Sequence, residues 1–195
     1  MKKSAESSVD LHPILAERWS PRSYDPDYQI SNEDLLGILE AARWSPSWTN
    51  NQPWRFIVAK KGSPEFENIS NKLSGFNKVW APKASLYLLI AAQTTNPDDT
   101  ARPMALYDSG IASANITTEA IHRGLVVHQI GGFDTEAVAK DFKFPLGLRP
   151  LTVLVIGKQA PADQLPDQAL IDREKSKRER LPLNELVINA AALNS

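Results

Sequence analysis

The sequence predicts an α+β protein in which a central, mostly antiparallel mixed sheet is flanked by helices. Four apolar segments read as strands, and segments of helical periodicity separate them. The connections between these segments are uneven in length, which favours the α+β class. With 195 residues, 42% of them hydrophobic, the chain is long enough for one domain with a real core. The predicted strands are Trp54–Lys60, Ala84–Ala92, Leu125–Ile130 and Leu151–Gly157.

The helical patterns have recognisable start and stop signals. Ser31 is a good N-cap and Asp34 follows three residues later, which gives a near capping box. Pro64 opens another helix at its first turn. The helix predicted from Ala105 is rich in small residues, so it is a candidate for the centre of the fold or for a subunit interface. The predicted helices are Leu11–Trp19, Ser31–Trp44, Ser63–Leu73, Ala105–Arg123 and Thr135–Phe142, and Phe76–Pro82 is expected to be irregular.

The two ends of the chain differ in character. We expect residues 1–8 to form a disordered tail and residues 9–195 to form a single domain. A densely charged run, Asp172–Arg180, reads as a solvated face when taken alone. Residues 181–193 then return to an apolar composition, and an apolar tail of this kind often docks on another surface, such as a partner subunit.

Composition excludes several classes of function. The net charge is −1, from 22 basic and 23 acidic residues, so no field for nucleic acid or for an anionic membrane surface is expected. Cysteine is absent, and the three histidines have no metal-like spacing, so no metal site is predicted. The longest apolar run is too short to cross a bilayer and the N-terminus lacks a secretory pattern, so we expect a cytoplasmic protein.

The most distinctive stretch is the polar loop Arg43–Phe56, which carries three of the five tryptophans. Its prolines, with its Ser, Thr and Asn residues, prevent a continuing helix. Polar groups flanked by large flat side chains suit a planar ligand that forms hydrogen bonds. Alternatively, this is a surface loop whose aromatic side chains roof the core, and the residues alone do not decide between the two.

Two further segments are suited to binding a ligand. Alternation after Pro21 places Arg18, Ser20 and Arg22 on one side of an extended segment, where they can grip a phosphate. The alternative there is a solvated basic edge. Gly131 and Gly132 follow a strand and offer bare backbone N–H groups, or simply form a tight turn into the next helix.

No nucleophile–base pair, nucleophile elbow, phosphate-binding P-loop or dinucleotide-binding glycine pattern occurs in the chain. Features that grip a ligand, without a reacting side chain, fit an enzyme whose chemistry belongs to a bound cofactor.

In its order of features the chain resembles the nitroreductase family of FMN-dependent NAD(P)H oxidoreductases. The resemblance covers about residues 10 to 190 and rests on Arg18–Tyr24, the Ser45–Trp54 loop, His128–Asp134 and the late Arg178-x-Arg180 pair. It implies a homodimer with two FMN sites at the interface, a C-terminal extension onto the partner, and NADH or NADPH as co-substrate.

The resemblance also assigns roles to individual residues. It places Arg18 and Ser20 at the phosphate and ribityl side of FMN, Arg22 near N1 and O2, and Asn77 at the N3/O4 edge, and it includes Trp19 among the cofactor-binding residues. Beside the ring it places Gln129, Ile130, Gly131 and Gly132, with a backbone N–H near N5. The resemblance also implies that Arg178 and Arg180 bind the phosphate, and that Pro46, Ser47 and Asn50 of the other subunit form a wall of the site.

Some positions depart from the family pattern. Many relatives carry Glu where Gly131 stands, and some carry Lys near the position of Trp80. The segment 96–103 is short, which leaves the substrate class open.

The activity that follows is a ping-pong transfer of hydride through flavin N5 to a nitroaromatic, quinone or similar electron-poor acceptor, with no catalytic side chain. Two alternatives remain. One is another redox chemistry on the same scaffold, such as reductive dehalogenation or oxidation of a small metabolite. The other is a flavin-binding module without catalysis.

Overall fold

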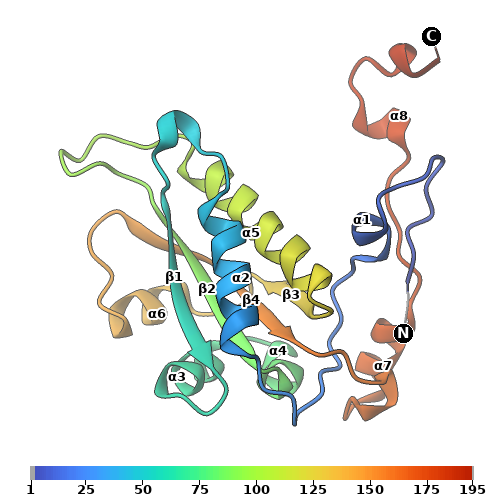
Figure 1. Ribbon diagram of the computed structural model, residues 1–195, viewed down its shortest axis with the longest axis horizontal. Coiled ribbons are helices and arrows are strands. Elements are labelled where there is room, and N and C mark those ends of the chain that lie inside the picture. The colour runs from blue at the N-terminus through green and yellow to red at the C-terminus, as the bar shows by residue number, and fades with distance from the viewer. Residues whose placement is uncertain (1–2, 195) are drawn as a thin grey trace.

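The computed structural model describes residues 3–194. Four strands form one sheet in the order β1-β2-β4-β3, and every pair of neighbours is antiparallel (Figure 1). The strands are β1 (Trp54–Lys60), β2 (Leu86–Gln93), β3 (Val126–Ile130) and β4 (Leu148–Gly157). The predicted α+β class, with a mostly antiparallel sheet, is confirmed.

Helices cover both faces of this sheet (Figure 1). On one face, α2 (Asn32–Arg43) and α5 (Ala105–His122) pack against each other and against the strands. The other face carries α3 (Pro64–Lys72), α4 (Asn77–Trp80), α6 (Thr135–Asp141) and α7 (Gln168–Lys175). The remaining elements are α1 (Pro13–Glu17), α8 (Leu183–Leu186), and the 3₁₀ turns η1 (Trp48–Asn50), η2 (Ala81–Lys83), η3 (Ala162–Gln164) and η4 (Ala190–Asn194).

The central strands are buried on both faces because successive side chains of a strand point to opposite sides. Along β2, Leu86, Leu88 and Ile90 belong to the core under α2 and α5, whereas Tyr87 and Leu89 belong to the opposite core. This explains why the sequence of β2 is an unbroken apolar run rather than an alternating one.

Local signals set most element boundaries. The Ser31 hydroxyl accepts a hydrogen bond from the Asp34 backbone N–H at 2.9 Å, so α2 begins where its cap predicts. The strand β4 begins three residues earlier than predicted, and it includes Pro150. Proline cannot donate to a ladder, but Pro150 pairs with Ala91 where the β2–β4 register shifts, so the missing donor is tolerated there.

The expected irregular segment 76–82 is instead helical, which is a correction. It forms α4 and then η2, and it buries Trp80. Four residues of helix carry too little periodicity to be read from sequence, and packing of the tryptophan stabilises them.

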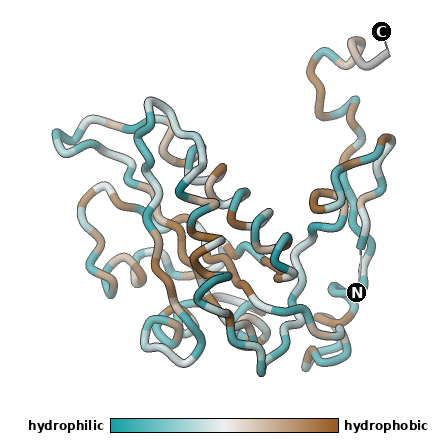
Figure 2. Tube along the Cα trace, in the orientation of Figure 1, coloured by the Kyte–Doolittle hydropathy of each residue, from teal (hydrophilic) through white to brown (hydrophobic). Residues whose placement is uncertain are grey.

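The N-terminal segment with α1 and the segment after α7 lie side by side, away from the sheet (Figure 1). Arg178 donates from Nη1 to the backbone carbonyl of Ala16 at 2.7 Å, which ties the segment after α7 to α1. Beyond this contact the chain continues into α8 and η4, and Figure 2 shows apolar residues along it. Within residues 3–194 no helix combines the length and apolar character that crossing a bilayer requires.

Candidate functional site

A basic pocket of about 190 Å³ lies where the N-terminal and C-terminal segments meet. Seven of its ten lining residues are lysine or arginine. Its residues are Lys3, Arg18, Trp19, Ser20, Arg22, Arg173, Ser176, Lys177, Arg178 and Arg180. Like charges around one small cavity repel one another, and a bound anion would relieve this repulsion, so the pocket is a candidate anion site.

Arg18 is the cation in this pocket that most needs an anion. Its side chain is partly buried, and among residues 3–194 its guanidinium has no hydrogen-bond or ion-pair partner. Burial, followed by the charges of Arg178 and Arg180, lowers the pKa of the guanidinium. A phosphate can accept hydrogen bonds from two N–H groups of this guanidinium at once, which would compensate both its burial and the repulsion from Arg178 and Arg180.

Other pocket cations are already held by the chain itself. Arg178 donates to the carbonyl of Lys3 at 2.7 Å, in addition to Ala16. The Lys3 ammonium donates to the carbonyl of Ser176 at 2.6 Å and lies 4.3 Å from the centre of the Trp19 ring. Lys3 is therefore a wall of the pocket, although the disorder expected for residues 1–8 as a whole stays a prediction.

A second polar group lies at the end of β3, where Gly131 and Gly132 follow Ile130. The Asn77 amide donates to the carbonyl of Gly132 at 3.4 Å, and the Ser74 backbone N–H donates to the same oxygen at 2.9 Å. A Cβ at position 132 would lie 3.1 Å from both the Asn77 Nδ2 and the Ser74 Oγ, whereas one at position 131 would meet nothing within 4 Å. Close packing therefore favours glycine at 132, while Gly131 faces open space. We call Asn77, Gly131 and Gly132 the amide corner.

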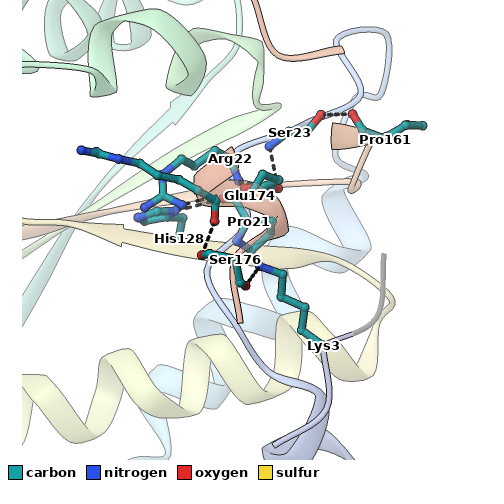
Figure 3. Close-up of polar contacts among 9 residues, drawn as sticks. Lys3, Pro21, Arg22, Ser23, His128, Pro161, Glu174 and Ser176 are labelled. Atoms are coloured by element: carbon teal, nitrogen blue, oxygen red, sulfur yellow. Dashed lines mark hydrogen bonds and ion pairs between the residues drawn. The ribbon is translucent and has the colours of Figure 1, made fainter. Parts of the chain in front are cut away.

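His128 connects the amide corner to the basic pocket. It lies on β3 two residues before the strand ends, and its Nδ1 is 2.9 Å from the carbonyl of Pro21 (Figure 3). Its ring packs on Trp80 of α4 with 4.6 Å between centroids, and Trp80 in turn stacks on Tyr24. The segment that carries Arg18 and Arg22 is thus fixed against the two elements that form the corner.

Burial lowers the pKa of His128 to about 4, and the charges of Arg22 and Arg18 act in the same direction, while the hydrogen bond with Pro21 opposes them. The folded state therefore binds this proton less tightly than the unfolded chain, in which the pKa is near 6.5. The contribution of neutral His128 to the free energy of unfolding is complete above pH 6.5. It is lost as the pH falls toward 4, at up to about 1.4 kcal/mol per pH unit.

We expect His128→Asn to have a shallower loss of stability than the unmodified protein between pH 6.5 and pH 4. An amide keeps a donor near the Nδ1 position but does not titrate. Urea unfolding midpoints at half-unit pH steps measure this difference. Carboxylates that titrate in the same range affect both proteins alike, so parallel curves would show that His128 is not the group responsible.

The loop Ser45–Trp54 is built on α5. The Asn115 amide donates to the Ser45 hydroxyl at 2.8 Å, and the buried Asp108 carboxylate accepts from the Trp48 backbone N–H at 3.1 Å. Three non-glycine residues, Thr49, Asn50 and Gln52, have left-handed φ angles of 50°, 57° and 46°. Such a conformation persists only where the surroundings enforce it, and it often marks a functional segment.

The aromatic side chains of this loop divide into two groups. Trp54 is buried in the core beneath α2 and α5, so for this residue the core-roof alternative is right. Trp44 and Trp48 are exposed, and so are Pro46 and Asn50.

One chain brings together only part of the predicted site. Arg18, Trp19, Ser20, Arg22, Arg178 and Arg180 line the basic pocket, and Asn77, Gly131 and Gly132 form the amide corner. Near the corner, the Gln129 amide donates to Thr117, and the Ile130 side chain is buried in the core, so only its backbone can face a ligand. The loop with Pro46, Ser47 and Asn50 joins α2 to β1, and in Figure 1 this connection lies away from α1 and the segment after α7, which carry or adjoin the pocket residues.

Sequence reasoning missed several residues of the pocket. They are Lys3, Arg173, Ser176 and Lys177, together with the buried Glu174 behind them. The charged run Asp172–Arg180 was the available signal, but a run of charges does not reveal which of its members turns inward. Among residues 3–194 no group of three or more acidic or histidine side chains is placed to hold a metal ion.

Comparison with known proteins places this geometry in context. Residues 15–79, which include Arg18–Arg22, the loop and Asn77, match the model of the Nitroreductase family. The chain is similar to the YdgI protein of Bacillus subtilis strain 168, which bears a provisional NAD(P)H nitroreductase name, at 29% identity over 77% of this chain and 89% of that protein. It is 34% identical to an uncharacterized 15.4 kDa protein of Mycolicibacterium smegmatis over 68% of this chain and 92% of the other. The chain is also similar to a solved structure described as an oxidoreductase containing FMN, with a TM-score of 0.88 and 29% identity. The match covers 94% of this chain and 93% of the chain in that structure.

Proposed function

The chain belongs to the nitroreductase family, and from this we propose that it is an FMN-dependent oxidoreductase that uses NAD(P)H to reduce electron-poor acceptors. We propose nitroaromatics and quinones as acceptor classes, reduced in a ping-pong cycle. The observation that carries the proposal is the partly buried Arg18 guanidinium, which has no partner among residues 3–194 and lies in a pocket with six further cations.

The residues present fit FMN at both of its ends. Its phosphate is a dianion, and the basic pocket offers Arg18, the Ser20 hydroxyl and Arg180 on walls from opposite ends of the chain. The flavin ring is a flat system with hydrogen-bonding edges, and the amide corner offers the Asn77 amide and the backbone beside Gly131, where nothing crowds the chain. The two groups are joined through His128 and Trp80, so one extended ligand can contact both.

A bound FMN would supply the redox chemistry, namely hydride acceptance from NAD(P)H and transfer of the electrons to the acceptor. The cations of the basic pocket would hold its phosphate, and the amide corner would orient the edge of its ring beside the uncrowded backbone at Gly131. Among the residues proposed to hold the cofactor, no serine hydroxyl is hydrogen-bonded to a side-chain base in the described part of the chain, which agrees with a chemistry that resides in the cofactor.

We further propose that the enzyme is a homodimer whose C-terminal extension lies on the partner. The loop with Pro46, Ser47 and Asn50 is too far from the pocket of its own chain to wall the site, so a second copy has to supply it. Four side chains of the C-terminal segment are exposed: Leu181 at 60%, Leu183 at 56%, Leu186 at 58% and Ile188 at 107% of full accessibility. Figure 2 shows this apolar arm away from the core, where a partner surface would cover it.

The visible absorption spectrum of the purified protein tests the proposal. We expect a yellow protein, or a colourless one that becomes yellow on addition of FMN, whose absorbance bleaches when NADH or NADPH is added without oxygen. A nitroaromatic or quinone should then restore the colour. Bound flavin that NAD(P)H bleaches poorly would favour another redox chemistry on this scaffold, and flavin that is never reduced would favour a binding module. Protein that ignores FMN altogether would overturn the proposal.

A further inference from the structure

Glu174 is a buried carboxylate directly behind the basic pocket, with only 1% of the residue exposed. Its two oxygens accept from the backbone N–H of Arg22 at 3.0 and 2.9 Å, and one of them accepts from the N–H of Ser23 at 3.2 Å (Figure 3). The Arg22 guanidinium lies 3.9 Å away from it. A carboxylate can be buried at acceptable cost when its lone pairs are satisfied in this way.

This carboxylate joins two segments that are about 150 residues apart. Glu174 belongs to α7, whose chain continues directly to Arg178 and Arg180, and it grips the backbone of the segment that carries Arg18 and Arg22. Glu174 therefore connects the opposite walls of the basic pocket from the buried side, in addition to the contacts that Arg178 and Lys3 make between them. The Ser23 hydroxyl, which donates to the carbonyl of Pro161 at 2.6 Å, anchors the same segment further from the pocket.

The charge of Glu174 also acts on the cations around it. Burial lowers the pKa of the Arg22 guanidinium and of the Lys3 amine, and the Glu174 charge opposes this lowering in both cases. It is the only carboxylate among residues 3–194 that is both buried and in contact with a residue of this pocket. Without it the cations would repel one another more strongly, and two buried or partly buried N–H groups would lose their acceptor.

We propose that Glu174 is a positioning residue for the cofactor phosphate, which it does not touch itself. It fixes the backbone of Arg22 against α7, and so sets the spacing between Arg18 on one wall and Arg180 on the other. An anion that contacts both walls then binds a preformed site and does not have to assemble it. This inference rests on the proposed function, because it assumes that the anion in the pocket is the phosphate of FMN.

The test compares the affinity of the apoprotein for FMN and for riboflavin, which lacks the phosphate. In Glu174→Gln the side chain keeps its size, but its NH₂ group faces an N–H donor and only one oxygen remains to accept. We expect the FMN Kd to rise about tenfold or more, as is usual when hydrogen bonds to a charged group are lost, with the riboflavin Kd changed by less than about twofold. Quenching of flavin fluorescence measures both.

The matched control is Glu179→Gln, which makes the same charge change at an exposed position of the same segment. It should leave both Kd values unchanged. If Glu174 had a purely structural role, Glu174→Gln would lower the melting temperature. The Kd values for FMN and riboflavin would then rise together or both stay unchanged, and either result would overturn the inference. So would an FMN Kd that rises no more than in the control.

Should Glu174→Gln not fold, Glu174→Asp serves with the same readout, because its shorter side chain keeps the charge but does not reach both N–H groups. Hydrogen exchange of the unmodified protein is the second measurement. FMN, but not riboflavin, should slow exchange in residues 18–24 and 171–180 together, and protection of only one segment would contradict the inference. Failure of the unmodified protein to bind FMN would instead defeat the proposed function itself.

Discussion

Arg18→Ala is expected to raise the Kd for FMN by about ten- to a hundredfold. The guanidinium is partly buried, has no partner among residues 3–194, and faces the like charges of Arg178 and Arg180, so an anion is what it lacks. Loss of one charge-assisted hydrogen-bonding contact costs about 1.5–3 kcal/mol, which corresponds to this range of affinity. Fluorescence titration of the apoprotein with FMN gives the Kd directly.

Removing Arg18 should also stabilise the ligand-free protein slightly, because it relieves repulsion inside the pocket. The control is Arg149→Ala, which removes an exposed arginine at the start of β4. Its FMN affinity should equal that of the unmodified protein. If Arg18→Ala bound FMN as tightly as the control, Arg18 would not belong to the site, and the pocket would have to bind another anion.

Deletion of residues 181–195 is expected to convert a dimer into a monomer at micromolar concentration, and to weaken FMN binding with it. The hydrogen bonds of α8 join residues of that segment to one another, so the deletion should leave the sheet and its helices folded. What it removes is the apolar arm of Leu181, Leu183, Leu186 and Ile188. Analytical ultracentrifugation measures the mass, and circular dichroism checks that the body is intact.

A point variant separates the arm's apolar surface from its length. Leu183→Ser combined with Ile188→Ser should weaken the dimer, whereas Leu146→Ser, at a residue 82% exposed on another part of the molecule, should not. A truncated protein that remains dimeric and keeps its FMN would show that the arm does not bind the partner. The second copy would then have to be held by another surface.

Much of the framework could be read from local signals in the chain. The strand Trp54–Lys60 has the predicted bounds, and the Ser31 cap starts its helix where expected. These predictions succeed because a cap needs only its near neighbours, and a strand of this composition needs only a sheet to join. The helical turn that carries Trp80 was not predicted, because it depends on packing against Tyr24 and His128 from distant parts of the chain.

The same division holds for the candidate site. Taken alone, the Arg18–Arg22 segment, the pair of glycines and the charged run left a structural alternative open, and it was their resemblance to the nitroreductase family that selected most of the residues lining the pocket and the corner. Glu174 could not be selected, because it is one of several acidic residues in a charged run, and only folding reveals that it turns inward to two backbone N–H groups. Lys3 was missed for a similar reason: its neighbours in space are Trp19 and Ser176.

By itself, the sequence determined the α+β class, the order of its elements, and the kinds of side chain available to a bound anion, because these depend on composition and on contacts between near neighbours. The tertiary structure decided which of the cations share one cavity, which carboxylate stands behind them, and that the tryptophan loop is remote from the pocket of its own chain. The physical reason is that the two walls of the pocket come from opposite ends of the chain. Their meeting depends on long-range packing and buried hydrogen bonds, and these leave no periodic signal in the sequence.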